Sequence, residues 1–388
     1  MTIWISHACT SPPPSPFPAD ILTQQPAMQP TLPAEPVSGP GYRIFPDSEL
    51  VLGPALKDFV FTDAIPAGSP LFTWGEEVPY SDEDRVYDGV EILAMVSREY
   101  SVNPRLLLAL LDYFSAAISS NPGIDVLQTP FLTDEPSLEG LYRQLSWAAN
   151  QLNRGYYSHR VGALKRITLA DGVQVDISGE VNAATAALQY LLGLLLGYHD
   201  WQLAVSPLGV RVSYLTLFGD PSQYAIEPLL PARLKQLPLA LPFNPDDGWY
   251  FTGGPHAAWG SGAAWGALDF APDEDQVGCY DSRNAVLAIA DGLVVRARNG
   301  AVVQNLDGLK DEGSGWTILY MHIAEQGRVP EGVYLNTGDE VGFPSCEGGP
   351  STGTHLHLAR RYNGEWIPAD QDLPFELDGE LVQTHMRQ

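Results

Sequence analysis

The chain has 388 residues, of which 45% are hydrophobic and 18% are charged, a composition typical of folded globular proteins and unlike disordered or collagen-like chains. This length exceeds one ordinary domain and suits two. Acidic residues outnumber basic ones 47 to 21, which argues against nucleic acid or an anionic membrane as a partner, because both require Lys and Arg for neutralisation. No stretch has the roughly 18–20 apolar residues of a transmembrane span.

Residues 1–45 are predicted to form a tether. From Thr10 to Gly41 the chain is dense in Pro, Ser, Gln and Thr, so it cannot bury enough apolar surface to offset the entropy of ordering. Cys9, followed by SPPPSP, looks like the first residue of a mature lipoprotein whose signal is truncated, which would make it a lipid anchor. The alternative is a stray cysteine in a disordered tail.

Residues 46–236 have a mainly helical pattern. Between Asp88 and Tyr100 the apolar residues lie on one face of a helix with a polar back. Asn103-Pro104 then supplies an N-cap followed by proline at the first position of a nearly all-apolar, central helix. The other predicted elements are a helix opened by Ser137, a hairpin over Ile167–Val175 and a Leu-rich helix that begins at Asn182.

The segment SVNPRLLLALLDYFSA resembles the helix of lysozyme-like transglycosylases. Ser115 matches that family's pattern, but Phe114 stands where its general-acid glutamate would be. The resemblance therefore implies a degenerate lysozyme-like domain that binds glycan or acts as a spacer, because a glycosidase without its acid cannot protonate the leaving oxygen. Glu99 and Asp112 lie nearby, and both are interpreted as carboxylates on a solvated helix face.

Residues 237–247, with three prolines, are predicted to be a linker, and residues 248–388 an antiparallel β domain. Short apolar runs alternate there with Gly, Asp and Asn turns, and hairpins are expected at Asp291-Gly292 and at Asn299-Gly300. The predicted fold class is therefore multidomain, with a mainly α domain, lysozyme-like in the interpretation above, followed by an all-β domain.

Four histidines and one aspartate in the β region form a candidate metal site. His355 and His357 are two residues apart, so in a strand both imidazoles point to the same face, although two surface imidazoles on a strand edge would give the same pattern. Asp269 lies in the apolar run ALDFAP, where a lone carboxylate is costly unless it is paired or bound to metal. The segment GGPHAAWGSGAAWG is predicted to be a Gly-rich loop that brings His256 towards this strand. Catalytic zinc takes three N or O ligands, which His256, Asp269 and one of the His355/His357 pair would supply. The other histidine of that pair and His322 would serve in acid–base chemistry and oxyanion stabilisation.

These residues resemble the LytM/lysostaphin-like zinc endopeptidases. The segments VLAIADGLVV, LNTGDEVGF and STGTHLHLARRYNG are similar to the family's hairpin, its turn before the active strand and its active strand. The wide spacing of the first His and the Asp is closest to the β-lytic and staphylolytic branch. The resemblance covers about residues 248–367, and the family's pattern appears in order as His256, Asp269, Tyr320-Met-His322 and His355-Leu-His357.

The resemblance implies that His256, Asp269 and His357 bind one zinc ion, while His322 and His355 flank the reacting water and the scissile carbonyl. It does not decide which of those two takes the proton. The function so implied is a zinc-dependent endopeptidase that hydrolyses peptidoglycan stems or cross-bridges outside the cytoplasm, either secreted or attached to the envelope. The alternative is a non-catalytic wall-binding scaffold or an activator of other wall hydrolases.

Two further pairs of residues bear on this site. A disulfide between Cys279 and Cys346 would clamp the loop after Asp269 to the segment before His355 and would suit an exported protein, but two buried thiols fit the sequence equally well. Trp259 and Trp265 lie among glycines and alanines and are interpreted as lining a substrate groove, with half-buried packing as the alternative.

Overall fold

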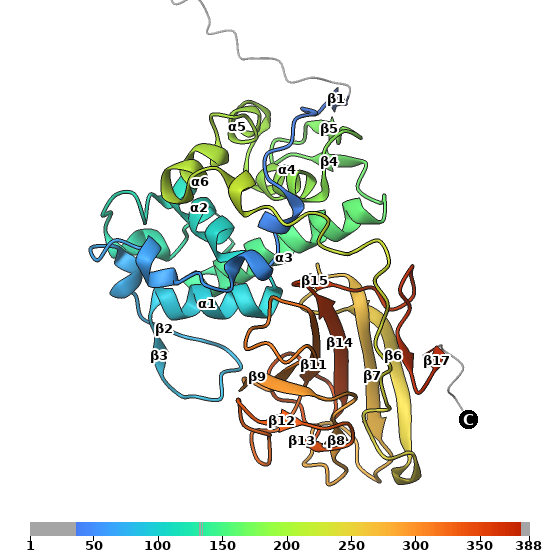
Figure 1. The fold of residues 1–388 in the computed structure, drawn as a ribbon. Helices are drawn as coiled ribbons and strands as arrows, with labels where there is room; N and C mark the ends of the chain where they lie inside the picture. The colour runs from blue at the N-terminus through green and yellow to red at the C-terminus, as the bar shows by residue number, and fades with distance from the viewer. Residues whose placement is uncertain (1–35, 132, 134, 382–388) are drawn as a thin grey trace, which may run out of the picture.

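The computed structural model describes residues 36–131, 133 and 135–381 (Figure 1). The helices lie together on one side of a large β sheet, and α1 and α3 are the long helices nearest to it. None of the helices in the described ranges has both the length and the apolar character needed to cross a membrane. Cys9 lies outside these residues, so the lipid anchor stays a prediction.

The first two helices follow the sequence signals closely. Helix α1, Gly89–Tyr100, begins with a capping box in which the Asp88 side chain accepts from the Glu91 backbone and the Glu91 side chain accepts from the Asp88 backbone. Helix α2, Pro104–Ser115, is capped by Asn103 and has proline at its first position. Residues 104–112 of α2 are all buried, as expected for a central helix.

Helix α3, Leu141–Arg160, begins four residues later than predicted. Pro136–Leu138 form a short 3-10 turn, and Gly140 has a φ of 107°, which breaks any helix that started at Ser137. The predicted hairpin and Leu-rich helix are confirmed. The hairpin consists of β4 (Arg166–Thr168) and β5 (Gln174–Asp176), and the Leu-rich helix is α4 (Ala183–Leu195). The remaining helices are α5 (Tyr198–Ala204) and α6 (Val210–Phe218).

The rest of the N-terminal half consists of short strands and 3-10 turns. Strand β1 (Val37–Ser38) pairs in parallel with β5, and β2 (Glu76–Glu77) pairs with β3 (Val86–Tyr87) at the base of an arm. The 3-10 turns besides Pro136–Leu138 span Asp47–Glu49, Pro54–Leu56, Phe61–Ala64, Pro70–Phe72, Ile124–Leu127, Pro221–Tyr224 and Pro245–Asp247.

The structure corrects two predictions in this half. Residues 36–45 were assigned to the tether, but β1 belongs to a sheet and Ile44 and Phe45 are buried in the helical core. Glu99 and Asp112 were interpreted as solvated, but they are 5% and 7% exposed. Asp112 Oδ1 accepts hydrogen bonds from two backbone amides beyond the end of α2, and Glu99 accepts one from the hydroxyl of Tyr142.

The C-terminal half is antiparallel, as predicted. Its main sheet has the order β12-β9-β10-β11-β14-β7-β6, and β15 pairs with β14. Two further pairs, β8 with β13 and β16 with β17, flank it. The strands are β6 (Trp249–Ala257), β7 (Trp265–Pro272), β8 (Val286–Leu287), β9 (Gly292–Arg298), β10 (Ala301–Asn305), β11 (Trp316–Met321), β12 (Tyr334–Leu335), β13 (Glu340–Gly342), β14 (Leu356–Tyr362), β15 (Glu365–Trp366), β16 (Glu376–Leu377) and β17 (Glu380–Leu381).

One of the two predicted hairpins is confirmed. Asn299 and Gly300 both have positive φ, 52° and 67°, as a two-residue hairpin turn requires, and they join β9 to β10. The hairpin at Asp291-Gly292 is wrong, because β8 pairs with β13 while β9 pairs with β10 and β12. Here the Asp-Gly pair turns the chain, but the strands before and after it, β8 and β9, do not pair with each other.

The centre of the main sheet is buried on both faces. Ile318 and Tyr320 of β11 point into the core of the β domain, whereas Leu319 and Met321 join the core of the helical domain. This double burial explains why β11 is a continuous apolar run instead of an alternating one. The predicted linker also packs, since Leu239 is buried in the β core, and the domain boundaries at 236 and 247 stay predictions.

Candidate active site

Three adjacent strands bring together the predicted metal ligands. Asp269 of β7 and His357 of β14 are directly opposite in the antiparallel register, so their side chains leave the sheet on the same face. His256 lies on β6, the other neighbour of β7, and not in a loop as its glycine-rich surroundings suggested. Irregular pairing of β6 with β7 on both sides of His256 shifts the register and turns its ring towards Asp269.

The ligand atoms of these three residues converge. His256 Nε2 lies 2.8 Å from Asp269 Oδ2, and His357 Nδ1 lies 3.4 Å from Asp269 Oδ1. One ligand atom from each residue falls within 4.8 Å of the others. This is a compact set of two nitrogens and one oxygen, the donor set that zinc prefers.

Backbone carbonyls set the direction in which each ligand imidazole presents its lone pair. His357 Nε2 lies 3.0 Å from the carbonyl of Ala258, and His256 Nδ1 lies 3.3 Å from that of Ala257. A carbonyl only accepts, so these nitrogens carry the protons and the opposite nitrogens face Asp269 with lone pairs. Three acceptors then meet around one point, and Asp269 Oδ1, although buried, accepts no hydrogen bond from any described residue. A cation at this point satisfies all three, so the residues fit a zinc ion.

The electrostatics of Asp269 agree with that arrangement. Burial alone would raise the pKa of its carboxyl, but the imidazoles of His256 and His357 outweigh burial and hold the pKa well below its usual range. When His256 is protonated on both nitrogens, its Nε2 donates to the same carboxylate, and this hydrogen bond raises the pKa of His256. Asp269 is therefore an anion at any working pH, as a metal ligand must be.

His322 and His355 complete the set on the other side of the cluster. His322 follows β11 directly and has a φ of 65°, and its Nδ1 donates to the carbonyl of Glu347 at 2.8 Å. His355 precedes β14, its Nδ1 lies 2.8 Å from the carbonyl of Gly353, and its Nε2 lies 3.9 Å from Asp269 Oδ1. The two ring centroids are 4.5 Å apart. Each Nε2 is therefore an unprotonated acceptor beside the ligand cluster.

Burial, together with the positive charge that His355 carries when it is protonated, lowers the pKa of His322 to about 4. The imidazole of His322 is thus neutral at neutral pH. This matches the tautomer set by Glu347, in which Nε2 is free to accept a proton.

A cleft of about 810 Å³ opens over all five residues, and both halves of the chain line it. Trp259 lies in its wall, as the groove interpretation predicted. Trp265 is 65% exposed and lines a separate hollow, so the groove interpretation is wrong for that residue. No sequence pattern indicated the wall contributed by the helical half, which consists of Pro79, Tyr80, Tyr100, Tyr142 and Arg143.

Cys279 and Cys346 form a disulfide, so the alternative of two buried thiols is wrong. The bridge joins the loop after β7 to the segment before β14, and their Cα atoms are 5.7 Å apart. Hydrogen bonds from Thr354 N to the carbonyl of Gly278 and from Tyr280 N to Thr354 Oγ1 run alongside it. Together they fix the approach of the chain to His355.

Two family models match the chain. Residues 43–232 match the LasA N-terminal domain, and residues 278–368 match peptidase family M23. The C-terminal domain belongs to peptidase family M23. The match includes His322, His355 and His357, whereas His256 and Asp269 precede it and are placed by the geometry above.

The chain is also similar to Protease LasA of Pseudomonas aeruginosa. The two are 27% identical over 332 residues, which cover 78% of this chain and 75% of LasA. The homology therefore extends over both halves of the M23 peptidase. It confirms the predicted family and the prediction of a metalloendopeptidase.

Solved structures of M23 enzymes are similar to part of this chain. The deep-sea M23 metalloprotease pseudoalterin is 22% identical, with a TM-score of 0.30, and the match covers 37% of this chain and 79% of that one. The catalytic domain of lysostaphin from Staphylococcus simulans is 25% identical, with a TM-score of 0.22, over 30% of this chain and 82% of that one. The lysozyme-like interpretation of the helical half stays a prediction. Phe114 there packs edge-on against Tyr113 and Phe131.

Proposed function

We propose that this M23 peptidase is a zinc-dependent endopeptidase that hydrolyses peptide bonds in bacterial peptidoglycan. The observation that carries the proposal is the cluster of one ligand atom each from His256, Asp269 and His357 within 4.8 Å, at the floor of an open cleft. Both imidazoles use their second nitrogen on a backbone carbonyl, so the cluster is already oriented for a metal.

In this proposal His256, Asp269 and His357 hold one zinc ion, which supplies Lewis-acid polarisation of the scissile carbonyl and activation of water. His322 and His355 offer Nε2 lone pairs on one side of the cluster. One accepts the proton of the attacking water and returns it to the leaving amine, and the other takes up a proton from solvent and donates a hydrogen bond to the oxygen that becomes negative.

A peptidoglycan substrate fits both the relatives and the cleft. Lysostaphin is described as an antimicrobial peptidase. The cleft is open enough for an extended peptide and is lined by aromatic rings, Trp259 and Tyr80 among them, that can pack on a backbone of small residues. The disulfide between Cys279 and Cys346 suits an oxidising compartment, which supports action outside the cytoplasm.

The test compares the full chain with His357→Ala and a matched histidine variant, His199→Ala, on the exposed side of α5. Zinc content is measured by mass spectrometry of dialysed protein, and hydrolysis by dye release from labelled peptidoglycan. We expect one zinc per chain and full dye release for wild type and His199→Ala, and neither for His357→Ala. Full zinc content in His357→Ala would refute the ligand assignment, and zinc-loaded wild type that releases no dye would refute the substrate.

A further inference from the structure

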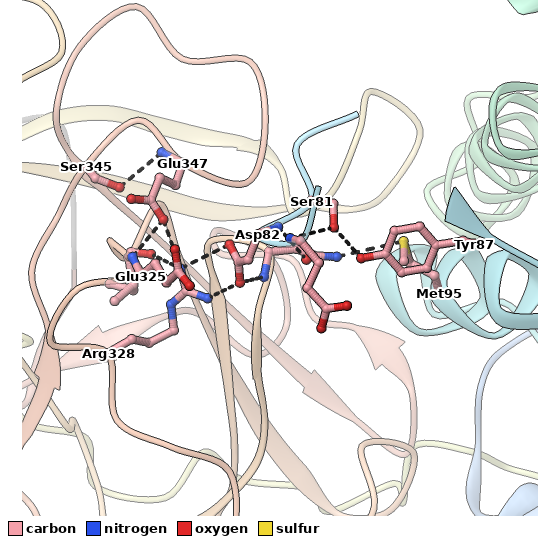
Figure 2. Close-up of polar contacts among 11 residues, drawn as sticks. Ser81, Asp82, Tyr87, Met95, Glu325, Arg328, Ser345 and Glu347 are labelled. Atoms are coloured by element: carbon pink, nitrogen blue, oxygen red, sulfur yellow. Dashed lines mark hydrogen bonds and ion pairs between the residues drawn. The ribbon is translucent and has the colours of Figure 1, made fainter. Parts of the chain in front are cut away.

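Arg328 is a buried cation at the boundary between the two halves of the chain. Its side chain is 5% exposed, and its guanidinium makes contacts in three directions (Figure 2). Nη1 lies 2.6 Å from Asp82 Oδ2, while Nη2 lies 3.0 Å from Glu347 Oε2 and 2.9 Å from the carbonyl of Ile323. A planar guanidinium with several fixed donors can hold all three acceptors at once.

Two of those partners flank His322. Glu347 supplies the carbonyl that accepts from His322 Nδ1, and Ile323 is the next residue in the chain. The positive φ of His322 places this residue in a region that non-glycine residues rarely adopt, so it needs support from its surroundings. Ser345 adds to that support, because its hydroxyl donates to the His322 carbonyl and accepts from Glu347 N.

The third partner, Asp82, comes from the helical half. It lies in the arm between β2 and β3, which reaches across to β9 in Figure 1. Its carboxylate also accepts from the backbone amide of Asn299, and its own amide donates to the Asn299 side chain. The arm is therefore fixed to the β9–β10 turn at the same point where it reaches Arg328.

We propose that Arg328 is a positioning residue for His322 and that Asp82 completes this role from the helical domain. Arg328 holds the Glu347 segment and the Ile323 carbonyl, and these hold the imidazole of His322 in the tautomer and direction that the reaction needs. Asp82 supplies a second carboxylate, which keeps the buried guanidinium in place between the two halves. The inference rests on the proposed function, and it makes the helical half part of the working enzyme.

The kinetic test uses the full chain with three substitutions and soluble cross-linked fragments prepared by digesting peptidoglycan with a muramidase. We expect Arg328→Gln and Asp82→Asn to lower kcat by roughly 10- to 100-fold with apparent KM within about twofold, because misplacing a catalytic group costs rate and not binding. Arg328→Lys should recover only part of the loss, since one ammonium cannot span the three acceptors. Zinc content should stay at one per chain in all three.

The matched control is Arg160→Gln, which breaks another ion pair between the halves, the 2.9 Å contact with Glu365, and neither of these residues lines the active-site cleft. We expect its kcat to equal that of wild type. A kcat within twofold of wild type in both Arg328→Gln and Asp82→Asn would overturn the proposal. A higher kcat/KM in Asp82→Asn would also overturn it, because the arm would then restrain the site and not support it.

A second measurement does not depend on peptidoglycan being the substrate. In protein labelled with ¹⁵N-histidine, the Nδ1 proton of His322, assigned as the signal absent from His322→Gln, should be a slowly exchanging, hydrogen-bonded resonance. It should weaken or vanish in Asp82→Asn and Arg328→Gln and persist in Arg160→Gln. An unchanged signal in both variants would overturn the positioning role even if wild type cleaved nothing, whereas loss of the signal in an inactive enzyme would sustain it and refute only the proposed substrate.

Discussion

Replacing Glu99 with Gln should change how the stability of the helical domain depends on pH. Glu99 lies in the last turn of α1, is 5% exposed and accepts a hydrogen bond of 3.2 Å from the hydroxyl of Tyr142. Burial raises the pKa of Glu99 to about 7, although the positive charge of Arg296 acts in the opposite direction. The carboxyl is therefore protonated in the folded chain over a range in which it is ionised in the unfolded chain.

The sign and size of the effect follow from that difference. Between about pH 4.5 and pH 7 the folded state binds a proton that the unfolded state has lost, so the free energy of unfolding falls as the pH rises. A shift from 4.5 to about 7, at 1.36 kcal/mol per unit, corresponds to about 3 kcal/mol. Gln cannot ionise, so Glu99→Gln should match wild type near pH 4.5 and exceed it by up to about 3 kcal/mol at pH 8.

The assay is urea unfolding of the full chain followed by ellipticity at 222 nm, which reports the helices, at several pH values between 4.5 and 8. Glu139→Gln, at an exposed glutamate just before α3, is the matched control and should follow wild type throughout. The other groups that titrate in this range contribute equally to the free energy of unfolding of both proteins, so their contributions cancel in the difference. A difference between wild type and Glu99→Gln that stays constant with pH would refute the reasoning.

Three further predictions concern the β domain. His355→Ala should retain one zinc per chain but lose at least about 100-fold in kcat, as an acid–base group would, and loss of zinc would instead make His355 a ligand. Replacing both Cys279 and Cys346 with Ser should lower the free energy of unfolding by up to about 4 kcal/mol, since the bridge closes a separation of 67 residues, and an unchanged urea midpoint would contradict this. Tyr320→Phe should cost about 1–3 kcal/mol in the same assay, because the buried hydroxyl accepts from Ile289 N and donates to the Gln304 side chain.

The chemistry of the site could be predicted because it depends on local periodicity. Two histidines separated by one residue must share a face of an extended strand, and His355 and His357 do lie in one site. An aspartate within an apolar strand needs a partner, and Asp269 has three histidines around it. His256 was expected in a loop, because the glycines around it are typical of turns, yet it lies on strand β6.

The contacts between the two halves could not be predicted in the same way. Asp82 and Arg328 are 246 residues apart, and no spacing rule relates them. The polar back of α1 indicated a solvated face, yet Glu99 is buried there, bound to Tyr142 of α3 and close enough to Arg296 of the β domain to feel its charge. Sequence periodicity shows which residues of one helix share a face, but not whether a second domain covers the opposite one.

The measurement that tests the central claim most directly is mass spectrometry of purified peptidoglycan after digestion by the full chain, with and without a zinc chelator. The proposed function predicts new peptide-bond termini that disappear with chelator and return when zinc is restored, and their masses identify the bond that is cut. New reducing ends on glycan strands, with the peptides left intact, would contradict it and assign the hydrolysis to the helical half.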